Sequence, residues 1–400
     1  MKLNTPPTCI KSLMIFALYL MLISCTAQPS QENMKQELIL GNEHFLENPK
    51  EWKDKNIGFV GNHTSLINGV HFVDTLISKG FKITRLYSPE HGFRGQGDAG
   101  EKIDHGIDKK TGLPIVSLYG SNKKPNKKQL EGIDVIFFDI QDVGVRYYTY
   151  TSTLHYVMEA AAEQGIPVVV FDRPNPNGHY VDGPVLKKEY ASFVGMHPVP
   201  IVHGMTIGEY ANMINEEGWL NQKIKVDLNV VKCVNYDRKS AYEVEVPPSP
   251  NLPNMRAIYL YPVLCLFEGT VVSVGRGTDA PFQQYGHPLF KELPHTFTPK
   301  PSFGAKQPKL EGEVCYGKSY IKLTQKELFE SAELDLSPII EAFNLYPDST
   351  TFFNNFFNLL AGNKELKDQI LAGRSKEEIE SSWQNELNQF KALRKKYLLY

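Results

Sequence analysis

The chain has 400 residues, of which 42% are hydrophobic and 22% are charged, and its formal net charge is -2. This composition is typical of a globular protein with one large α/β domain and a smaller partner, or with two or three domains. The near-neutral charge argues against nucleic acid as the main partner, because nucleic-acid binding normally requires a basic face.

The first 25 residues have the pattern of an export signal. Lys2 and Lys11 precede an apolar run over residues 13–23, which is too short for a membrane span and fits the core of a signal peptide. The run ends in Leu-Ile-Ser-Cys, which resembles the bacterial lipobox. We expect residues 1–25 to be a lipoprotein signal, residues 26–37 to be a polar tether, and lipid on Cys25 to anchor the exported protein in the cell envelope, facing the periplasm. A plain signal peptide with an incidental cysteine is the alternative.

Apolar runs alternate with amphipathic stretches from residue 57 onward. This alternation predicts an α/β fold with a parallel sheet and helices on its faces. The expected strands are 57–61, 83–87, 114–119, 133–139 and 166–171, and the expected helices are 73–78 and 151–164. Gly165 follows the second helix and is a typical C-terminal stop.

The pattern changes after about residue 185. Proline-rich punctuation appears at 197–200 and 247–250, and residues 271–274 are a further candidate strand. Near the C-terminus, Ser375 and Glu378 form a capping box before an amphipathic helix. We therefore expect a smaller α+β domain in this part of the chain.

Polar and charged side chains follow four of the predicted strands. In an open parallel sheet, ligands bind beyond the carboxyl ends of the strands, so these side chains are expected at one edge. A helix cap or a loop hydrogen bond is the plain alternative for any single one of them. The segments are 62–65, 88–95, 139–146 and 172–178.

Searches for cofactor and metal motifs are negative. Residues 95–100 match G-x-G-x-x-G, but the segment 88–94 separates them from the strand and no amphipathic helix follows. We interpret them as a flexible active-site loop and expect no cofactor. H-E-x-x-H, G-x-S-x-G and P-loop motifs are absent from the sequence, and we expect no metal. A disulfide among Cys233, Cys265 and Cys315 stays open.

Taken together, these segments resemble the exo-β-N-acetylmuramidases, a bacterial family long catalogued as a domain of unknown function. The likeness runs from about residue 38 to the C-terminus, and one departure is apolar Val272 and Val274 where polar residues are expected. The matching stretches are 61–64, Ser88-Pro89-Glu90-His91-Gly92 with 93–95, 139–150, 172–176, 268–270 and 275–278.

The resemblance implies a fold and an activity. The fold is a Rossmann-like catalytic domain over residues 38–190, with a C-terminal α+β domain over 191–400 that closes the cleft. The activity is release of β-1,4-linked N-acetylmuramic acid (MurNAc) from the non-reducing end of peptidoglycan fragments such as MurNAc linked to N-acetylglucosamine (GlcNAc). Such an enzyme serves cell-wall turnover or recycling.

Glycoside hydrolysis requires an acid that protonates the leaving oxygen, and usually a second carboxylate. The resemblance and the strand-end position both favour Glu90 as the acid, with His91 beside it. Asp142 is the first candidate for the second group. Asp139, Asp172, Glu268, Asp279 and the acetamido group of the substrate are the alternatives.

Muramic acid carries a lactyl carboxylate, which a specific enzyme is expected to meet with an arginine. Arg94, Arg146, Arg173 and Arg276 are candidates, although Arg146 and Arg173 fit equally well as partners of Asp142 and Asp172. Tyr147 is expected to stack on a sugar face; Tyr148 and Tyr150 are further candidates, with core packing as the alternative for at least one of the three. The other expected substrate-binding residues are Asn62, His63, Asp139, Gln141, Asp172, Asn175, Glu268 and Thr278.

Three other functions compete with this interpretation. A sugar-binding lipoprotein without catalysis fits a two-domain, parallel-sheet chain. A cell-wall amidase or esterase lacks its usual zinc ligands or nucleophile elbow here. An endo-acting or GlcNAc-releasing glycosidase differs mainly in loop closure over the site.

Overall fold

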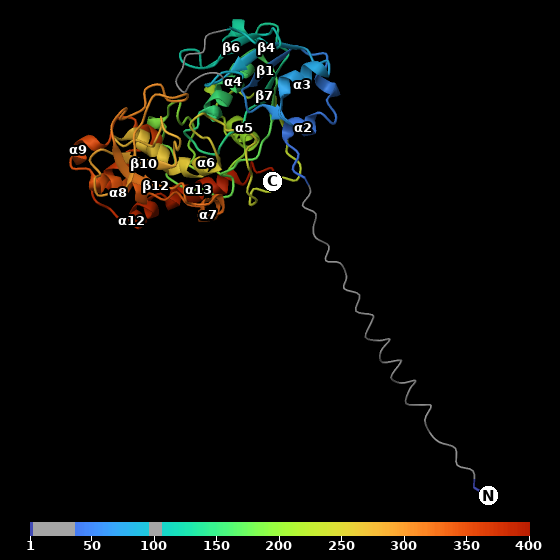
Figure 1. Ribbon diagram of the computed structural model, residues 1–400. Coiled ribbons are helices and arrows are strands. Elements are labelled where there is room, and N and C mark those ends of the chain that lie inside the picture. Colours follow the sequence, from blue (N-terminus) through green and yellow to red (C-terminus); the bar gives the residue numbers. More distant parts are fainter. Residues whose placement is uncertain (3–36, 96–105) are drawn as a thin grey trace. The chain divides into compact units, whose positions relative to one another are not determined.

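A seven-stranded sheet organises the first part of the chain (Figure 1). The computed structural model describes residues 1–2, 37–95 and 106–400. All neighbouring strands in the sheet are parallel except β5 and β6, which confirms the predicted parallel sheet. In spatial order the strands are β5 (Gly106–Ile107), β6 (Pro114–Ser117), β4 (Ile83–Ser88), β1 (Ile57–Gly61), β7 (Val135–Asp139), β8 (Val168–Phe171) and β9 (Leu228–Val231).

Helices cover both faces of this sheet, because its central strands are apolar on both sides. In β7, Phe137 packs in one core and its neighbours Ile136 and Phe138 pack in the other. The first core is shared with α2 (Gly41–Phe45) and α3 (Phe72–Ser78), and the second with α4 (Tyr150–Gln164) and α5 (Ile207–Glu216). The predicted helices and strands of this region are confirmed within a few residues at their ends.

Gly165 ends α4 with a left-handed φ of 65°, as the sequence predicts.

The sheet layer continues after residue 190, because α5 packs on the sheet and β9 pairs with β8. The predicted domain boundary at 190/191 stays a prediction.

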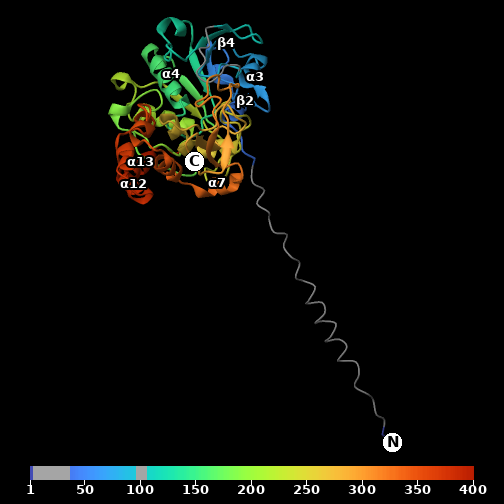
Figure 2. The ribbon, with the colours of Figure 1, turned by 60° about the vertical axis from the view of Figure 1, so that its left-hand side comes forward.

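The second part of the chain combines helices, several of them labelled in Figure 2, with a small antiparallel sheet, two of whose strands are labelled in Figure 1. Its strands are β10 (Gln284–His287), β11 (His295–Phe297) and β12 (Cys315–Ser319). Its helices are α6 (Met255–Leu264), α7 (Gln325–Ser331), α8 (Ser337–Leu345), α9 (Ser349–Phe352), α10 (Phe357–Ala361), α11 (Glu365–Leu371), α12 (Lys376–Ser382) and α13 (Gln384–Arg394).

Several short elements complete the fold. A hairpin follows β1, and single turns of 3-10 helix occur along the chain. They are β2 (Leu66–Ile67), β3 (Val70–His71), η1 (Lys50–Trp52), η2 (Lys127–Leu130), η3 (Lys188–Tyr190), η4 (Asn221–Lys223) and η5 (Cys265–Gly269).

One predicted strand is wrong and one predicted helix start is confirmed. Residues 271–274 form no ladder, because the flanking Thr270 bridges to Phe353 whereas Ser273 bridges to Gly286, so the backbone partners lie in two different segments. The apolar signal came from two buried valines, Val272 and Val274. The Ser375–Glu378 capping box does begin a helix, α12.

Parts of the predicted N-terminal organisation lie outside the described residues. These are nearly all of the signal segment, Cys25, most of the tether, and nearly all of the glycine-rich segment 95–100. Among the residues that the structure does describe, no helix has the length and apolar character needed to cross a membrane. Cys233, Cys265 and Cys315 are buried free thiols.

Candidate active site

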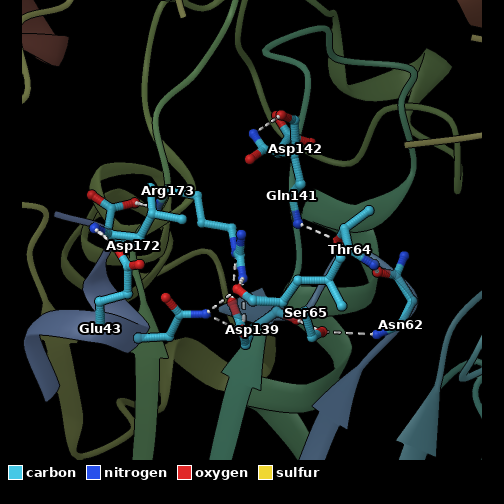
Figure 3. Close-up of polar contacts among 12 residues, drawn as sticks. Glu43, Asn62, Thr64, Ser65, Asp139, Gln141, Asp142, Asp172 and Arg173 are labelled. Atoms are coloured by element: carbon cyan, nitrogen blue, oxygen red, sulfur yellow. Dashed lines mark hydrogen bonds and ion pairs between the residues drawn. The ribbon is translucent and has the colours of Figure 1, made fainter. Parts of the chain in front are cut away.

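A buried ion pair ties the carboxyl ends of β7 and β8 together (Figure 3). Asp139 ends β7 and accepts hydrogen bonds from Arg173 Nε at 2.6 Å and Nη2 at 3.0 Å. Asn42 donates a third hydrogen bond to the same carboxylate at 3.1 Å. Both charged side chains are buried, so each neutralises the other. Arg173 therefore pairs with Asp139 and not with Asp172, the partner that the sequence suggested.

The loop after β1 is joined to the same edge by neutral hydrogen bonds (Figure 3). Asn62 Oδ1 accepts from the Thr64 hydroxyl at 2.6 Å, and Asn62 Nδ2 donates to the Tyr150 hydroxyl at 2.9 Å. Thr64 in turn accepts from the backbone N–H of Gln141 at 3.0 Å. Gln141 Nε2 donates to the carbonyl oxygen of Pro174 at 2.8 Å. Asn62 and Gln141 thus brace neighbouring loops.

Asp172 anchors the start of α5. Its carboxylate accepts from the Thr206 hydroxyl at 2.7 Å, the Gly208 N–H at 2.8 Å and the Tyr400 hydroxyl at 2.8 Å. Burial raises the pKa of Asp172 to about 6, against the lowering effect of these hydrogen bonds. Asn175, also buried, donates to the Met205 carbonyl oxygen at 2.9 Å in the loop before the same helix.

Asp142 lies beneath the loops and not in the cavity wall. The Gly144 N–H donates to its carboxylate at 2.7 Å, and His203 Nε2 lies 3.9 Å away. Burial raises the pKa of Asp142 to about 7. A cavity lies between the loops after β4 and β7 and the second part of the chain, and Asp142 is not among the residues that line it. Its contacts are those of a loop brace.

Besides Arg173, two more of the candidate arginines are engaged elsewhere. Arg94 pairs with Asp108 at 2.7 Å and with Asp74 at 2.9 Å, beside the sheet. Arg146 is 1% exposed and donates to four main-chain carbonyl oxygens at 2.8–2.9 Å. These oxygens belong to Pro184, Val199, Leu360 and Ala361.

A cavity of about 140 Å³ lies where the loops after β4 and β7 meet the second part of the chain. Of the predicted site residues, it brings together Glu90, His91, Tyr147 and Arg276. Its other lining residues are Tyr148, Thr149, Tyr150, Ser249, Asn251, Leu252, Tyr261 and Phe282.

The proline-rich segment 247–252 forms one wall of this cavity. His63 Nε2 donates to the Pro247 carbonyl oxygen at 2.8 Å, and the Tyr148 hydroxyl donates to that of Pro248 at 2.8 Å. His63 therefore holds the wall from the sheet edge. From the sequence this segment was predicted only as punctuation, whereas in the structure a turn closed by the Leu252 N–H and the Ser249 carbonyl oxygen at 2.9 Å shapes the wall.

A tight turn presents Glu90 and His91 to the cavity. His91 has a left-handed φ of 70°, which is uncommon for a residue with a side chain, and Gly92 follows with a φ of 80°. His91 Nε2 lies 3.4 Å from the Ser249 hydroxyl in the proline-rich wall. Tyr119 lies near Glu90, and burial, followed by the charge of Glu90 and hydrogen bonding with it, raises the pKa of Tyr119.

Arg276 is the one candidate arginine among the four that lines the cavity. Its Nη1 lies 3.7 Å from Glu268 Oε2, and its Nη2 donates to the Gly304 carbonyl oxygen at 3.2 Å. Thr278 donates to the Gly275 carbonyl oxygen at 2.6 Å and so shapes the turn that carries Arg276.

No cluster of three or more metal-ligating side chains occurs within residues 37–95 and 106–400.

Known proteins match almost the whole chain. Models of the N-terminal and C-terminal parts of the exo-β-N-acetylmuramidase NamZ match residues 57–256 and 259–400. The peptidoglycan β-N-acetylmuramidase NamZ of Bacillus subtilis (strain 168) is 40% identical over 402 residues, covering 94% of this chain and 95% of that protein.

Two solved structures share the fold. Both are crystal structures of DUF1343 family proteins from Bacteroides fragilis NCTC 9343, with TM-scores of 0.85 and 0.76. They are 43% and 30% identical to this chain, and each comparison covers 91% of this chain and 99% of the other.

Asp139→Asn is expected to lower the free energy of unfolding by about 3–5 kcal/mol, because it leaves the buried Arg173 charge without its carboxylate. Urea unfolding of residues 26–400 measures this loss. The control is Arg374→Met in the Arg374–Glu378 pair, whose side chains are 59% and 53% exposed, and it should change stability by no more than about 0.5 kcal/mol. Equal effects of both substitutions contradict the role of the buried pair.

Proposed function

This chain belongs to the exo-β-N-acetylmuramidase family of glycoside hydrolases, and we propose that its cavity holds the terminal β-1,4-linked MurNAc of a peptidoglycan fragment and releases it from the non-reducing end. The observation that carries this proposal is the placement of Glu90 and Arg276 in one cavity. A carboxyl group and a guanidinium group in one cavity match the two needs of the reaction, a proton for the leaving oxygen and a cation for the lactyl carboxylate.

Glu90 is the proposed general acid. Its carboxyl proton passes to the glycosidic oxygen as the bond to C1 of MurNAc breaks, and GlcNAc leaves as an alcohol. Tyr119 lies near this carboxyl group. The adjacent His91, fixed by its turn, lines the same space.

The acetamido group of the substrate is the proposed nucleophile. Among the described residues that line the cavity, Glu90 is the single carboxylate, and Asp142 lies behind the wall. The acetamido oxygen attacks C1 and forms a cyclic intermediate. Water then adds to C1 while Glu90, now a carboxylate, takes the proton from that water.

Arg276 is the proposed partner of the lactyl carboxylate. Charge-assisted pairing of a guanidinium with a carboxylate is strong and directional. Glu268 and the Gly304 carbonyl oxygen restrict the guanidinium from two sides. The ring of Tyr147, whose hydroxyl donates to the Pro262 carbonyl oxygen, lines the same cavity and is proposed to pack against the sugar.

Residues 26–400 should release MurNAc from both para-nitrophenyl β-MurNAc and the MurNAc–GlcNAc disaccharide, and should not cleave the para-nitrophenyl GlcNAc compound. Glu90→Gln is expected to lower kcat on the disaccharide by about 10²–10⁴-fold, because an alkoxide leaving group needs the proton. The loss on the para-nitrophenyl compound should be smaller, because nitrophenolate leaves without protonation.

The matched control is Glu131→Gln, an exposed glutamate on the loop before β7, which should retain wild-type rates. Absence of MurNAc release by the wild-type protein contradicts the proposed function. Full activity of Glu90→Gln on the disaccharide contradicts its role as the acid.

We also propose that Cys25 carries a lipid that anchors the protein in the cell envelope, facing the periplasm. The support is the basic residues, the apolar run 13–23 and the lipobox-like residues 22–25 of the sequence. Two or three acyl chains on one residue hold a protein stably at a membrane.

Metabolic labelling with a palmitate analogue tests this anchor in cells that express the full chain. The wild-type protein should take up the label and sediment with membranes, whereas Cys25→Ala should do neither. Cys315→Ala, which removes a buried thiol, is the control and should still be labelled. An unlabelled wild-type protein contradicts the proposal.

A further inference from the structure

Lys309 binds the loop behind Arg276 through main-chain oxygens. Its ammonium group donates to the carbonyl oxygens of Phe267, Thr270 and Val272 at 2.9, 2.7 and 3.1 Å. A lysine ammonium has three N–H donors, so these contacts use all of them. Lys309 therefore acts on the loop and does not itself bind a ligand.

The three carbonyl oxygens flank Glu268 on both sides in the sequence. Phe267 belongs to the last turn of η5, where the carbonyl ends of a helix favour a cation. Thr270 and Val272 follow on the other side of Glu268, which reaches the Arg276 guanidinium. Fixing both flanks of Glu268 fixes the carboxylate that restrains Arg276.

Lys309 also changes the charge of this wall. No carboxylate forms an ion pair with it in the part of the chain that the structure describes, and its hydrogen-bond partners are neutral. Burial lowers the pKa of Lys309, and the nearby charge of Glu268 partly offsets this lowering. Lys309 and Arg276 thus place two cations beside one anion, Glu268, in this part of the wall.

We propose that Lys309 is a positioning residue that makes the cavity selective for a sugar with a carboxylate. It holds the loop 267–272 so that Glu268 directs Arg276, and its charge keeps the wall attractive to an anion. This inference rests on the proposed function, because it takes the lactyl carboxylate as the group that Arg276 meets.

The test compares two para-nitrophenyl β-glycosides, that of MurNAc and that of its lactyl methyl ester, which has nearly the same shape and no charge. Lys309→Gln keeps two N–H donors for the loop but removes the charge, and Lys309→Arg keeps the charge. The preference of kcat/KM for the acid over the ester should fall roughly tenfold in Lys309→Gln, mainly through KM. Lys309→Arg should keep most of the wild-type preference for the acid over the ester.

Lys318→Met is the control, because Lys318 lies in β12 and pairs with Glu341 at 2.6 Å. It should leave the preference unchanged. If Lys309→Gln lowers kcat/KM equally for acid and ester, Lys309 only stabilises the fold and the proposal is wrong. If Lys309→Gln does not fold, Lys309→Arg still tests the proposal. A preference for the acid over the ester in Lys309→Arg as low as that of Arg276→Met contradicts the proposal.

The same experiment separates an error in the proposed function from an error in the role of Lys309. If the proposed function is wrong, the wild-type protein has no preference for the acid over the ester, or Arg276→Met leaves that preference intact. A preference that Arg276→Met removes and Lys309→Gln does not touch overturns the role of Lys309 alone.

Discussion

A buried guanidinium group joins the loops beyond the sheet to the helices of the second part of the chain. Arg146 follows β7, and its hydrogen bonds join the carbonyl oxygens of two loops to those at the end of α10. Burial lowers the pKa of Arg146 to about 10, so the group stays protonated at neutral pH. Removing it takes a donor from each of the four oxygens, and a buried carbonyl oxygen left without a donor costs more than its hydrogen bond contributes. The Val199 oxygen keeps the Leu186 N–H at 3.1 Å.

The backbone at this join leaves little space for change. A Cβ atom on Gly362 would lie 2.6 Å from Arg146 Nη2, and Gly362 has a left-handed φ of 78°. Glycine is therefore required for both reasons. Arg146 thus joins the loop after β7 to the end of α10 in the second part of the chain.

The polar residues at the sheet edge divide into two layers. Those that end the strands, such as Asp139 and Asp172, are buried and hold loops and a helix start. Those in the loops that follow the strands, such as Glu90 and His91 after β4, line the cavity. A rigid inner layer supports an outer layer that can meet a sugar, which is how a scaffold holds reacting groups in place.

The sequence predicted the sheet and its helices well, because long apolar runs and capping residues act locally. It also predicted which edge of the sheet carries the polar residues. It did not separate braces from cavity residues, since Arg173 can reach Asp139 or Asp172 and only the packed backbone decides between them. The wall at Ser249 and the partner Tyr119 were missed because their proximity to Glu90 arises from contacts distant in sequence.

In the proposed complex, terminal MurNAc binds with its glycosidic oxygen at Glu90 and its carboxylate at Arg276. A crystal structure of Glu90→Gln with the MurNAc–GlcNAc disaccharide would show both contacts. We expect the amide introduced by this substitution to lie within hydrogen-bond distance of the bridging oxygen, and the lactyl carboxylate to lie on the Arg276 guanidinium. A disaccharide bound in the cavity with its carboxylate turned away from Arg276, or bound outside the cavity, would contradict it.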